Sequence, residues 1–130
     1  MEINVLEMPL DLGASRHGSD MGPSAIRLAG LKEKITELGH KITKFSCPME
    51  QHPQEYEDVE NPKAKYLSLI TKACNQLAEK VEVAALNKEF PIILGGDHSI
   101  VLGSLAGMSA ACKKLGKKIG VLYVDAHGDF

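Results

Sequence analysis

The sequence contains no tryptophan, and aromatic residues make up only 5% of its 130 positions. It also lacks an excess of positive charge, because 15 basic side chains are set against 17 acidic ones for a net charge of −2. We therefore expect no nucleic-acid partner, since no broad basic surface is available to attract a phosphate backbone. The apolar runs are too short to cross a bilayer, so no membrane association is expected either.

Cysteine is also scarce: Cys47, Cys74 and Cys112 are spread along the chain and include no Cys-x-x-Cys pair. A structural zinc site built on cysteine is therefore not expected. The first residues do not form a signal-peptide pattern, and reduced thiols are typical of the cytoplasm. We accordingly expect a cytoplasmic protein.

What the sequence does contain is an ordinary globular balance of 44% hydrophobic and 25% charged residues. Its length corresponds to one domain at most. Short β-like runs alternate with helical patterns along the chain. We expect strands at residues 3–8, 41–45, 90–94 and 119–124, and helices that begin at Pro23, at Asn61–Pro62 and near Ser99. The order β-α-β-α-β-α-β, with strands that are apolar on both faces, predicts a parallel sheet covered by helices on both sides.

Each expected helix carries an apolar stripe at spacings of three and four residues, which predicts its buried face. The first stripe consists of Leu28, Leu31, Ile35 and Leu38, the second of Leu67, Ile70, Cys74, Leu77 and Val81, and the third of Val101, Leu105, Met108, Cys112 and Leu115. The acidic and proline-containing stretch 46–60 is expected to be a solvated loop.

In parallel sheets, ligands bind beyond the carboxyl ends of the strands, which directs attention to the residues after positions 8, 94 and 124. Asp125, His127 and Asp129 follow the last expected strand at alternate positions. In an extended chain such side chains project from one face, where two carboxylates and an imidazole are costly to bury without a counter-charge. A divalent cation supplies that charge.

A second cluster, Gly95-Gly96-Asp97-His98-Ser99, follows the strand expected at 90–94. The glycines permit a sharp turn that presents His98 at the start of a helix, on the same edge of the sheet as Asp125. Oxygen-rich sites with one or two imidazoles suit Mn²⁺, Fe²⁺ or Zn²⁺, and the excess of carboxylate favours Mn²⁺. Because a carboxylate has two oxygens and can bridge two cations, we expect a two-metal site.

Each of these residues also has an interpretation without metal. His98 alone is more typical of a helix cap or a surface histidine, Asp125 alone of a helix cap, and Gly95-Gly96 of a tight turn. A phosphate site is not favoured, because the sequence contains neither Gly-x-Gly-x-x-Gly nor Gly-x-x-x-x-Gly-Lys-Ser/Thr. The combination of Asp-x-His-x-Asp with a second histidine at a strand end is what favours metal binding.

These residues resemble a known family. The segments 94–100 (LGGDHSI) and 124–129 (VDAHGD) are similar to two early signature motifs of the ureohydrolase superfamily, which contains arginases, agmatinases and formimidoylglutamases. The stretch 9–27, which begins PLDLG and ends GPSAIR, favours the bacterial arginase branch. The resemblance implies an arginase-like three-layer α/β sandwich with a parallel sheet, of which residues 1–130 form the amino-terminal part of a single domain.

The resemblance also implies a site and a reaction. His98 would bind one Mn²⁺ and His127 the other, with Asp125 and Asp129 as carboxylate ligands, while Asp97 would support a ligand or stabilise the turn. The complete protein would use two Mn²⁺ per active site to hydrolyse a guanidinium group, with L-arginine giving L-ornithine and urea. Since members of this family assemble into trimers or hexamers, the complete protein is expected to be a homo-oligomer.

The sequence departs from the family pattern in one respect. The third family motif, Asp-x-Asp, and the loop that binds the substrate's amino and carboxylate groups are absent from these 130 residues. We therefore expect a truncated sequence that is inactive as a 130-residue segment, and a run 119–124 that lacks both neighbouring strands. The alternatives are an agmatinase or formimidoylglutamase of the same superfamily, a non-catalytic metal-binding fragment, and a nucleotide-binding domain of similar fold.

Overall fold

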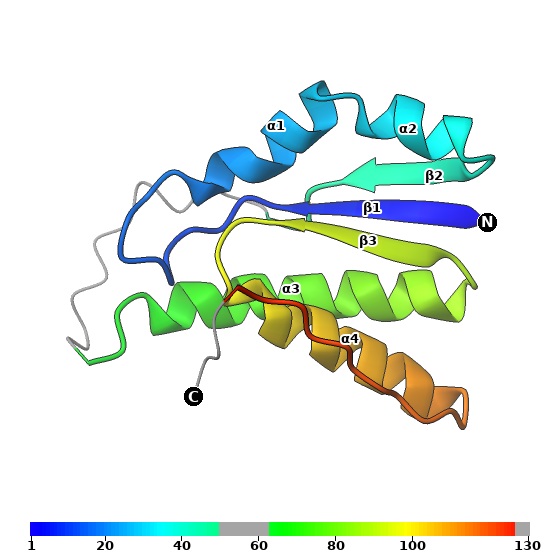
Figure 1. The fold of residues 1–130 in the computed structure, drawn as a ribbon. Helices are drawn as coiled ribbons and strands as arrows, with labels where there is room; N and C mark the ends of the chain where they lie inside the picture. Colours follow the sequence, from blue (N-terminus) through cyan, green and yellow to red (C-terminus); the bar gives the residue numbers. More distant parts are fainter. Residues whose placement is uncertain (50–62, 127–130) are drawn as a thin grey trace.

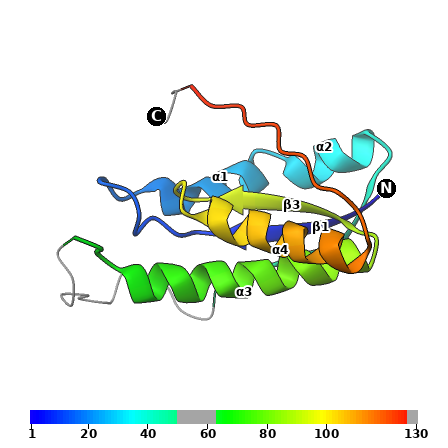
Figure 2. The same cartoon turned by 90° about the horizontal axis from the view of Figure 1, so that it is seen from below.

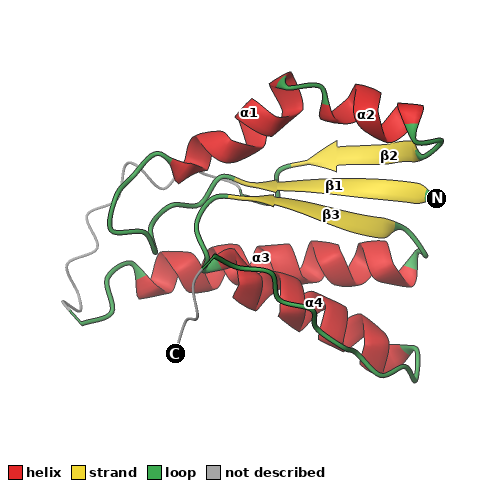
Figure 3. Cartoon of the chain, in the orientation of Figure 1, coloured by secondary structure: helices red, strands yellow, loops and turns green. Residues whose placement is uncertain are grey.

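The computed structural model describes residues 1–49 and 63–126 of the chain. Along the sequence the elements are β1 (Glu2–Met8), the 3-10 helix η1 (Ser19–Met21), α1 (Gly22–Leu28), α2 (Leu31–Glu37), β2 (Lys41–Ser46), α3 (Leu67–Leu86), β3 (Phe90–Gly95) and α4 (Ile100–Lys114). They form three layers, with α1 and α2 on one face of the sheet and α3 and α4 on the other (Figures 1 and 3). The predicted helix-covered parallel α/β architecture is thus confirmed. None of the described helices has the length and hydrophobicity of a membrane-spanning segment.

The sheet has three parallel strands in the order β2-β1-β3, so β1 is its central strand. Val5 of β1 is paired with Phe45 on one side and with Ile92 on the other. All three strands start and end within one residue of the runs predicted at 3–8, 41–45 and 90–94. Because the strands run in the same direction, their carboxyl ends lie along one edge, which we call the carboxyl edge, and their amino ends lie along the opposite, amino edge.

The central strand β1 is buried on both faces. Its alternate side chains enter two different clusters: Ile3 and Val5 pack with Ile35 of α2, whereas Leu6 and Met8 pack with Leu77 and Val81 of α3. Each large apolar side chain that is fully buried stabilises the fold by about 1.5–3 kcal/mol relative to its exposed state. The central strand of the carboxyl edge is therefore fixed by packing on both of its faces.

Helices α3 and α4 pack through glycine rather than through the large residues of α4. A Cβ atom at Gly103 would lie 2.6 Å from the carbonyl oxygen of Cys74, and one at Gly107 would overlap the carbonyl oxygen of Ala78. The prediction that Val101, Leu105, Met108, Cys112 and Leu115 form the buried face is therefore wrong in part. The buried residues of α4 are Gly103, Gly107 and Ala111, while Leu105 is 38% and Leu115 is 46% exposed. Only Met108 of the predicted stripe packs against the core cluster around Leu77.

The first predicted helix is two helices. Gly30, with φ of +96°, adopts a left-handed conformation between α1 and α2 and ends the regular helical path. Leu28, the last residue of α1, and Leu38, which follows α2, are 84% and 72% exposed, which contradicts their predicted burial. Of the predicted stripe, Ile35 is buried and Leu31 is half-buried. Both lie on α2 and pack in the cluster that contains Val5 of β1.

Helix α3 begins later than predicted. The expected start at Asn61–Pro62 lies outside the described residues, and the helix begins at Leu67 after Tyr66, whose φ of 57° is left-handed. Leu67 is 58% exposed, which contradicts its predicted burial. The rest of the stripe is oriented as predicted, because Cys74, Leu77 and Val81 are buried in α3 and Ile70 packs against their cluster.

The run 119–124 is not a strand in the structure, which contradicts the prediction of a fourth strand. It runs as an extended segment from the end of α4 back toward the carboxyl edge (Figure 1). Figure 2 shows that this segment stands clear of α3. Its apolar side chains are open to solvent, with Leu122 91% and Val124 90% exposed. A strand needs a hydrogen-bonding neighbour, and in the described part of the chain no strand pairs with this run.

A carboxylate ties the three strands together at the amino edge. Asn4 Nδ2 donates a hydrogen bond to Glu89 Oε2 (2.8 Å), and Thr43 Oγ1 donates one to Glu89 Oε1 (2.7 Å). These two hydrogen bonds, first that of Thr43 and then that of Asn4, lower the pKa of Glu89 below its ordinary value of 4.5. Glu89, which immediately precedes β3, therefore links β1 and β2 to the start of β3.

The replacement Glu89→Gln tests this link through the pH dependence of stability. A carboxyl group whose pKa is lower in the folded state stabilises the fold above its unfolded pKa and loses that contribution as pH falls through the folded pKa. We expect the unmodified chain to be more stable than the variant at pH 7, and this difference to shrink as the pH is lowered from 5 to 3. Urea unfolding at each pH measures the difference; a gap that stays constant down to pH 3 would contradict the assignment.

Candidate metal centre

The loops that follow β1 and β3 meet at the carboxyl edge. The backbone N–H of Asp97 donates a hydrogen bond to the carbonyl oxygen of Leu10 (2.7 Å). A Cβ atom at Gly96 would overlap this carbonyl oxygen, so a side chain at position 96 is incompatible with the contact. Gly96 is therefore needed for a close approach between two backbones, and not only to change the direction of the chain after β3.

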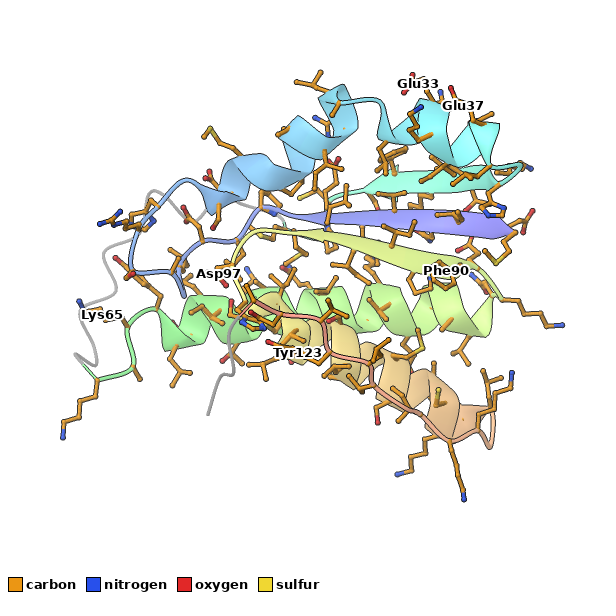
Figure 4. The ribbon with its side chains drawn as sticks, in the orientation of Figure 1. Glu33, Glu37, Lys65, Phe90, Asp97 and Tyr123 are labelled. Atoms are coloured by element: carbon orange, nitrogen blue, oxygen red, sulfur yellow. The ribbon has the colours of Figure 1, made fainter. Side chains whose placement is uncertain are left out.

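The carboxylate of Asp97 accepts hydrogen bonds from both loops at the point where they cross, next to the Leu10 carbonyl. Its Oδ1 accepts hydrogen bonds from the backbone N–H (2.8 Å) and the hydroxyl of Ser99, while its Oδ2 accepts one from the backbone N–H of Gly13 (2.6 Å). The side chain thus connects the loop after β1 with the residues that lead into α4. His98 lies between Asp97 and Ser99, so its backbone is held from both sides. Figure 4 shows Asp97 where the turn after β3 enters α4.

His98 and Asp125 line one open pocket of about 460 Å³ at the carboxyl edge. The pocket is also lined by Asp97 and by apolar residues of β3 and α4. The ring of Tyr123 is stacked on the His98 ring, with centroids 5.5 Å apart and planes inclined by 12°, and its hydroxyl forms a hydrogen bond with His98 Nε2. The structure therefore brings together two of the four predicted metal ligands, although 26 residues separate them in the sequence.

The other two predicted ligands, His127 and Asp129, lie outside the described residues. Within residues 1–49 and 63–126, no three His, Cys, Asp or Glu side chains are grouped so that they could hold a metal ion. His98 and Asp125 supply an imidazole nitrogen and a carboxylate oxygen to one pocket, which is the mixed donor type that Mn²⁺, Fe²⁺ and Zn²⁺ accept. The donors that the structure does place therefore fit a divalent cation, as part of a larger ligand set.

A buried thiol lies beneath the same turn. Cys74 of α3 is 8% exposed, and its Sγ donates to the backbone carbonyl oxygen of Ser99 (3.4 Å). Burial raises the pKa of this thiol above its ordinary value, which disfavours the thiolate. Cys74 therefore contributes to the packing of α3 against α4.

A further buried carboxylate at this edge, Asp11, belongs to neither of the two clusters that the sequence indicates. It follows β1, the first of the three strand ends beyond which a ligand is expected. The structure places Asp11 there with only 1% of its surface exposed. Its Oδ2 accepts a hydrogen bond from the backbone N–H of Gly18 (2.9 Å) and lies 3.2 Å from His17 Nδ1. The available signal was an acidic residue within three positions of the end of a buried strand.

Comparisons with known proteins agree on one family. The family model described as "Arginase family" matches residues 1–130. The arginase of Bacillus subtilis (strain 168) is 41% identical over 128 residues, which are 98% of this chain and 40% of that protein. The arginase of Brevibacillus brevis is 40% identical over 127 residues, which are 98% of this chain and 41% of that protein. The chain thus spans about 40% of the length of these curated relatives.

Solved structures show the same likeness. The crystal structure of arginase from Bacillus cereus superposes with a TM-score of 0.72 at 42% identity, over 85% of this chain and 35% of that chain. The native structure of arginase from Bacillus caldovelox at pH 5.6 superposes with a TM-score of 0.75 at 34% identity, over 83% of this chain and 36% of that chain.

Replacing Gly96 by alanine tests the backbone crossing. Because the added methyl group would overlap the Leu10 carbonyl, the two loops must separate and the Asp97–Leu10 hydrogen bond must lengthen or break. We expect a loss of about 1–3 kcal/mol in the free energy of unfolding, the usual cost of overpacking. Gly120→Ala is the matched control, since a Cβ atom there meets nothing within 4 Å. Equal stability of the two variants in urea unfolding would show that the crossing is not tight.

Proposed function

This chain belongs to the arginase family, and on that premise we propose that residues 1–130 form the amino-terminal part of a single arginase-like domain that hydrolyses a guanidinium group. The observation that carries the proposal is the meeting of His98 and Asp125 in one pocket at the carboxyl edge. The motifs to which these two residues belong are the ones that resemble the ureohydrolase signatures. The names of the curated relatives support arginine as the substrate.

The proposed metal centre combines residues from both motifs. His98 and Asp125, together with His127 and Asp129, would hold two Mn²⁺ ions in the complete protein. When bound, Mn²⁺ supplies positive charge that lowers the pKa of water and so makes a nucleophile available at neutral pH. The carboxylates balance the charge of the cations, and a neutral imidazole offers one nitrogen lone pair. Asp97 supports this arrangement through its hydrogen bonds to Gly13 and Ser99.

The proposed reaction converts L-arginine and water into L-ornithine and urea. In the family pattern, further ligands in an Asp-x-Asp motif and the loop that binds the substrate's amino and carboxylate groups follow the segment seen here. Because neither feature occurs among these 130 residues, we propose that residues 1–130 on their own do not release urea. The cytoplasmic location and the trimeric or hexameric assembly expected for the complete protein stay predictions.

The substrate is tested on the full gene product that contains these residues, purified and supplied with Mn²⁺. We expect urea from L-arginine, and a loss of about 100-fold or more in turnover for Asp129→Asn, because even residues that only support metal ligands contribute about 10–100-fold. Glu37→Gln, at an exposed position on α2, is the matched control and should retain activity. Colorimetric urea assays and metal analysis of each protein give the two readouts.

Three outcomes would contradict parts of this proposal. Hydrolysis of agmatine or formimidoylglutamate without hydrolysis of arginine would overturn the substrate. Unchanged metal content and turnover in Asp129→Asn would remove that residue from the ligand set. Urea released by a purified chain of residues 1–130 would overturn the proposed inactivity of this segment.

A further inference from the structure

Asp11 is a buried carboxylate in the loop that follows β1. It is 1% exposed, and a buried carboxylate is costly unless hydrogen bonds or opposite charges compensate for the lost water. Its compensation comes from the backbone N–H of Gly18 and from the imidazole of His17, whose side chain is 64% exposed. The His17 side chain is mostly exposed, and its ring is charged only when protonated, so the bond to Gly18 is the more important of the two.

The bond between Asp11 and Gly18 closes the loop that follows β1. Gly18 has φ of +122°, a conformation that side chains rarely permit, and its carbonyl oxygen accepts a hydrogen bond from the N–H of Met21 (3.3 Å) at the start of α1. The carbonyl oxygen of Asp11 accepts a second bond from the N–H of Ala14 (3.1 Å). Both the side chain and the backbone of Asp11 therefore determine the path of residues 11–18.

The two residues that connect this loop to the candidate metal centre flank Asp11. The Leu10 carbonyl oxygen accepts from the N–H of Asp97, and the N–H of Gly13 donates to Asp97 Oδ2. The second oxygen of Asp97 accepts from Ser99, and His98 lies between them. A change in the path of residues 11–13 thus reaches His98 through a continuous chain of short hydrogen bonds. Figure 4 shows the position of Asp97 in this chain, between the loop after β1 and the start of α4.

We propose that Asp11 is a positioning residue for His98: by closing the 11–18 loop it presents the N–H of Gly13 to Asp97, which holds the turn that carries His98. This inference rests on the proposed function, because it assigns a supporting residue to the same metal centre. A residue that only stabilises the fold would affect the whole sheet, whereas we expect the loss of Asp11 to disturb the carboxyl edge alone. An uncharged side chain with an acceptor oxygen at position 11 would preserve the bond to Gly18. We therefore expect the path of the loop to depend on the acceptor oxygen more than on its negative charge.

The test uses the full gene product that contains these residues and compares Asp11→Ala and Asp11→Asn with Glu89→Gln as a matched control. Glu89 is also a carboxylate that bridges strands by hydrogen bonds, but it does so at the amino edge. The rates of amide hydrogen exchange of Gly13 and Gly18 measure how well the loop 11–18 is held. Broadening of the His98 imidazole resonances by added Mn²⁺ measures metal binding at the proposed centre. Urea unfolding of each variant separates these readouts from overall stability.

For Asp11→Ala we expect the amides of Gly13 and Gly18 to exchange about 10-fold faster and His98 to require about 10-fold more Mn²⁺ for equal broadening, the usual size of an effect on metal ligands transmitted by a supporting residue. Asp11→Asn should rescue both readouts to near the unmodified values. Glu89→Gln should lower stability at pH 7 and leave both readouts unchanged.

Unchanged Gly13 exchange and His98 broadening in Asp11→Ala would overturn the proposal, as would equal changes in Glu89→Gln. If Asp11→Ala does not fold, Asp11→Ser is read in the same way, because its side chain is polar but too short to reach Gly18. If Mn²⁺ does not broaden His98 in the full gene product without substitutions, the proposed metal centre fails. The exchange of Gly13 then still decides whether Asp11 holds the loop.

Discussion

The carbonyl oxygen of Leu10 lies where two loops of the carboxyl edge cross, and the arrangement of the candidate site depends on this contact. It accepts the N–H of Asp97 at 2.7 Å and excludes any side chain from position 96. Once the two backbones are this close, the Asp97 carboxylate can reach Gly13 on one loop and Ser99 on the other. The turn that carries His98 is therefore held by backbone groups and one carboxylate, in addition to the packing of Ile100 against the core.

The rest of the fold supplies a firm base for that turn. β1 is buried on both faces and carries the loop that ends at Gly18, while β3 and α4 carry the turn with His98. Gly103 and Gly107 let α4 approach α3 closely, which fixes the helix whose first turn follows His98. At the amino edge, Glu89 joins the same strands through side chains, so the two edges of the sheet are stabilised by separate sets of polar contacts.

Three of the four expected strands and their parallel direction could be predicted, because buried apolar runs separated by helical patterns follow simple rules. The location of a site at the carboxyl edge stays a prediction. The face of α4 could not, since periodicity counts large apolar residues whereas Gly103 and Gly107 act through the absence of a side chain. The break at Gly30 was missed because the apolar spacing continues across it. A strand at 119–124 depends on a neighbour that the described residues do not provide. Asp11 was missed because it stands alone in the sequence, and only the fold shows that its neighbours Leu10 and Gly13 contact Asp97.

The metal centre that we propose lies at the carboxyl edge, between His98 and Asp125. Crystals of the complete gene product grown with Mn²⁺, with diffraction recorded on both sides of the manganese absorption edge, test it most directly. We expect anomalous difference density within coordinating distance of His98 and Asp125. Well-ordered His98 and Asp125 side chains with no such density between them, or manganese bound only elsewhere in the molecule, would contradict it.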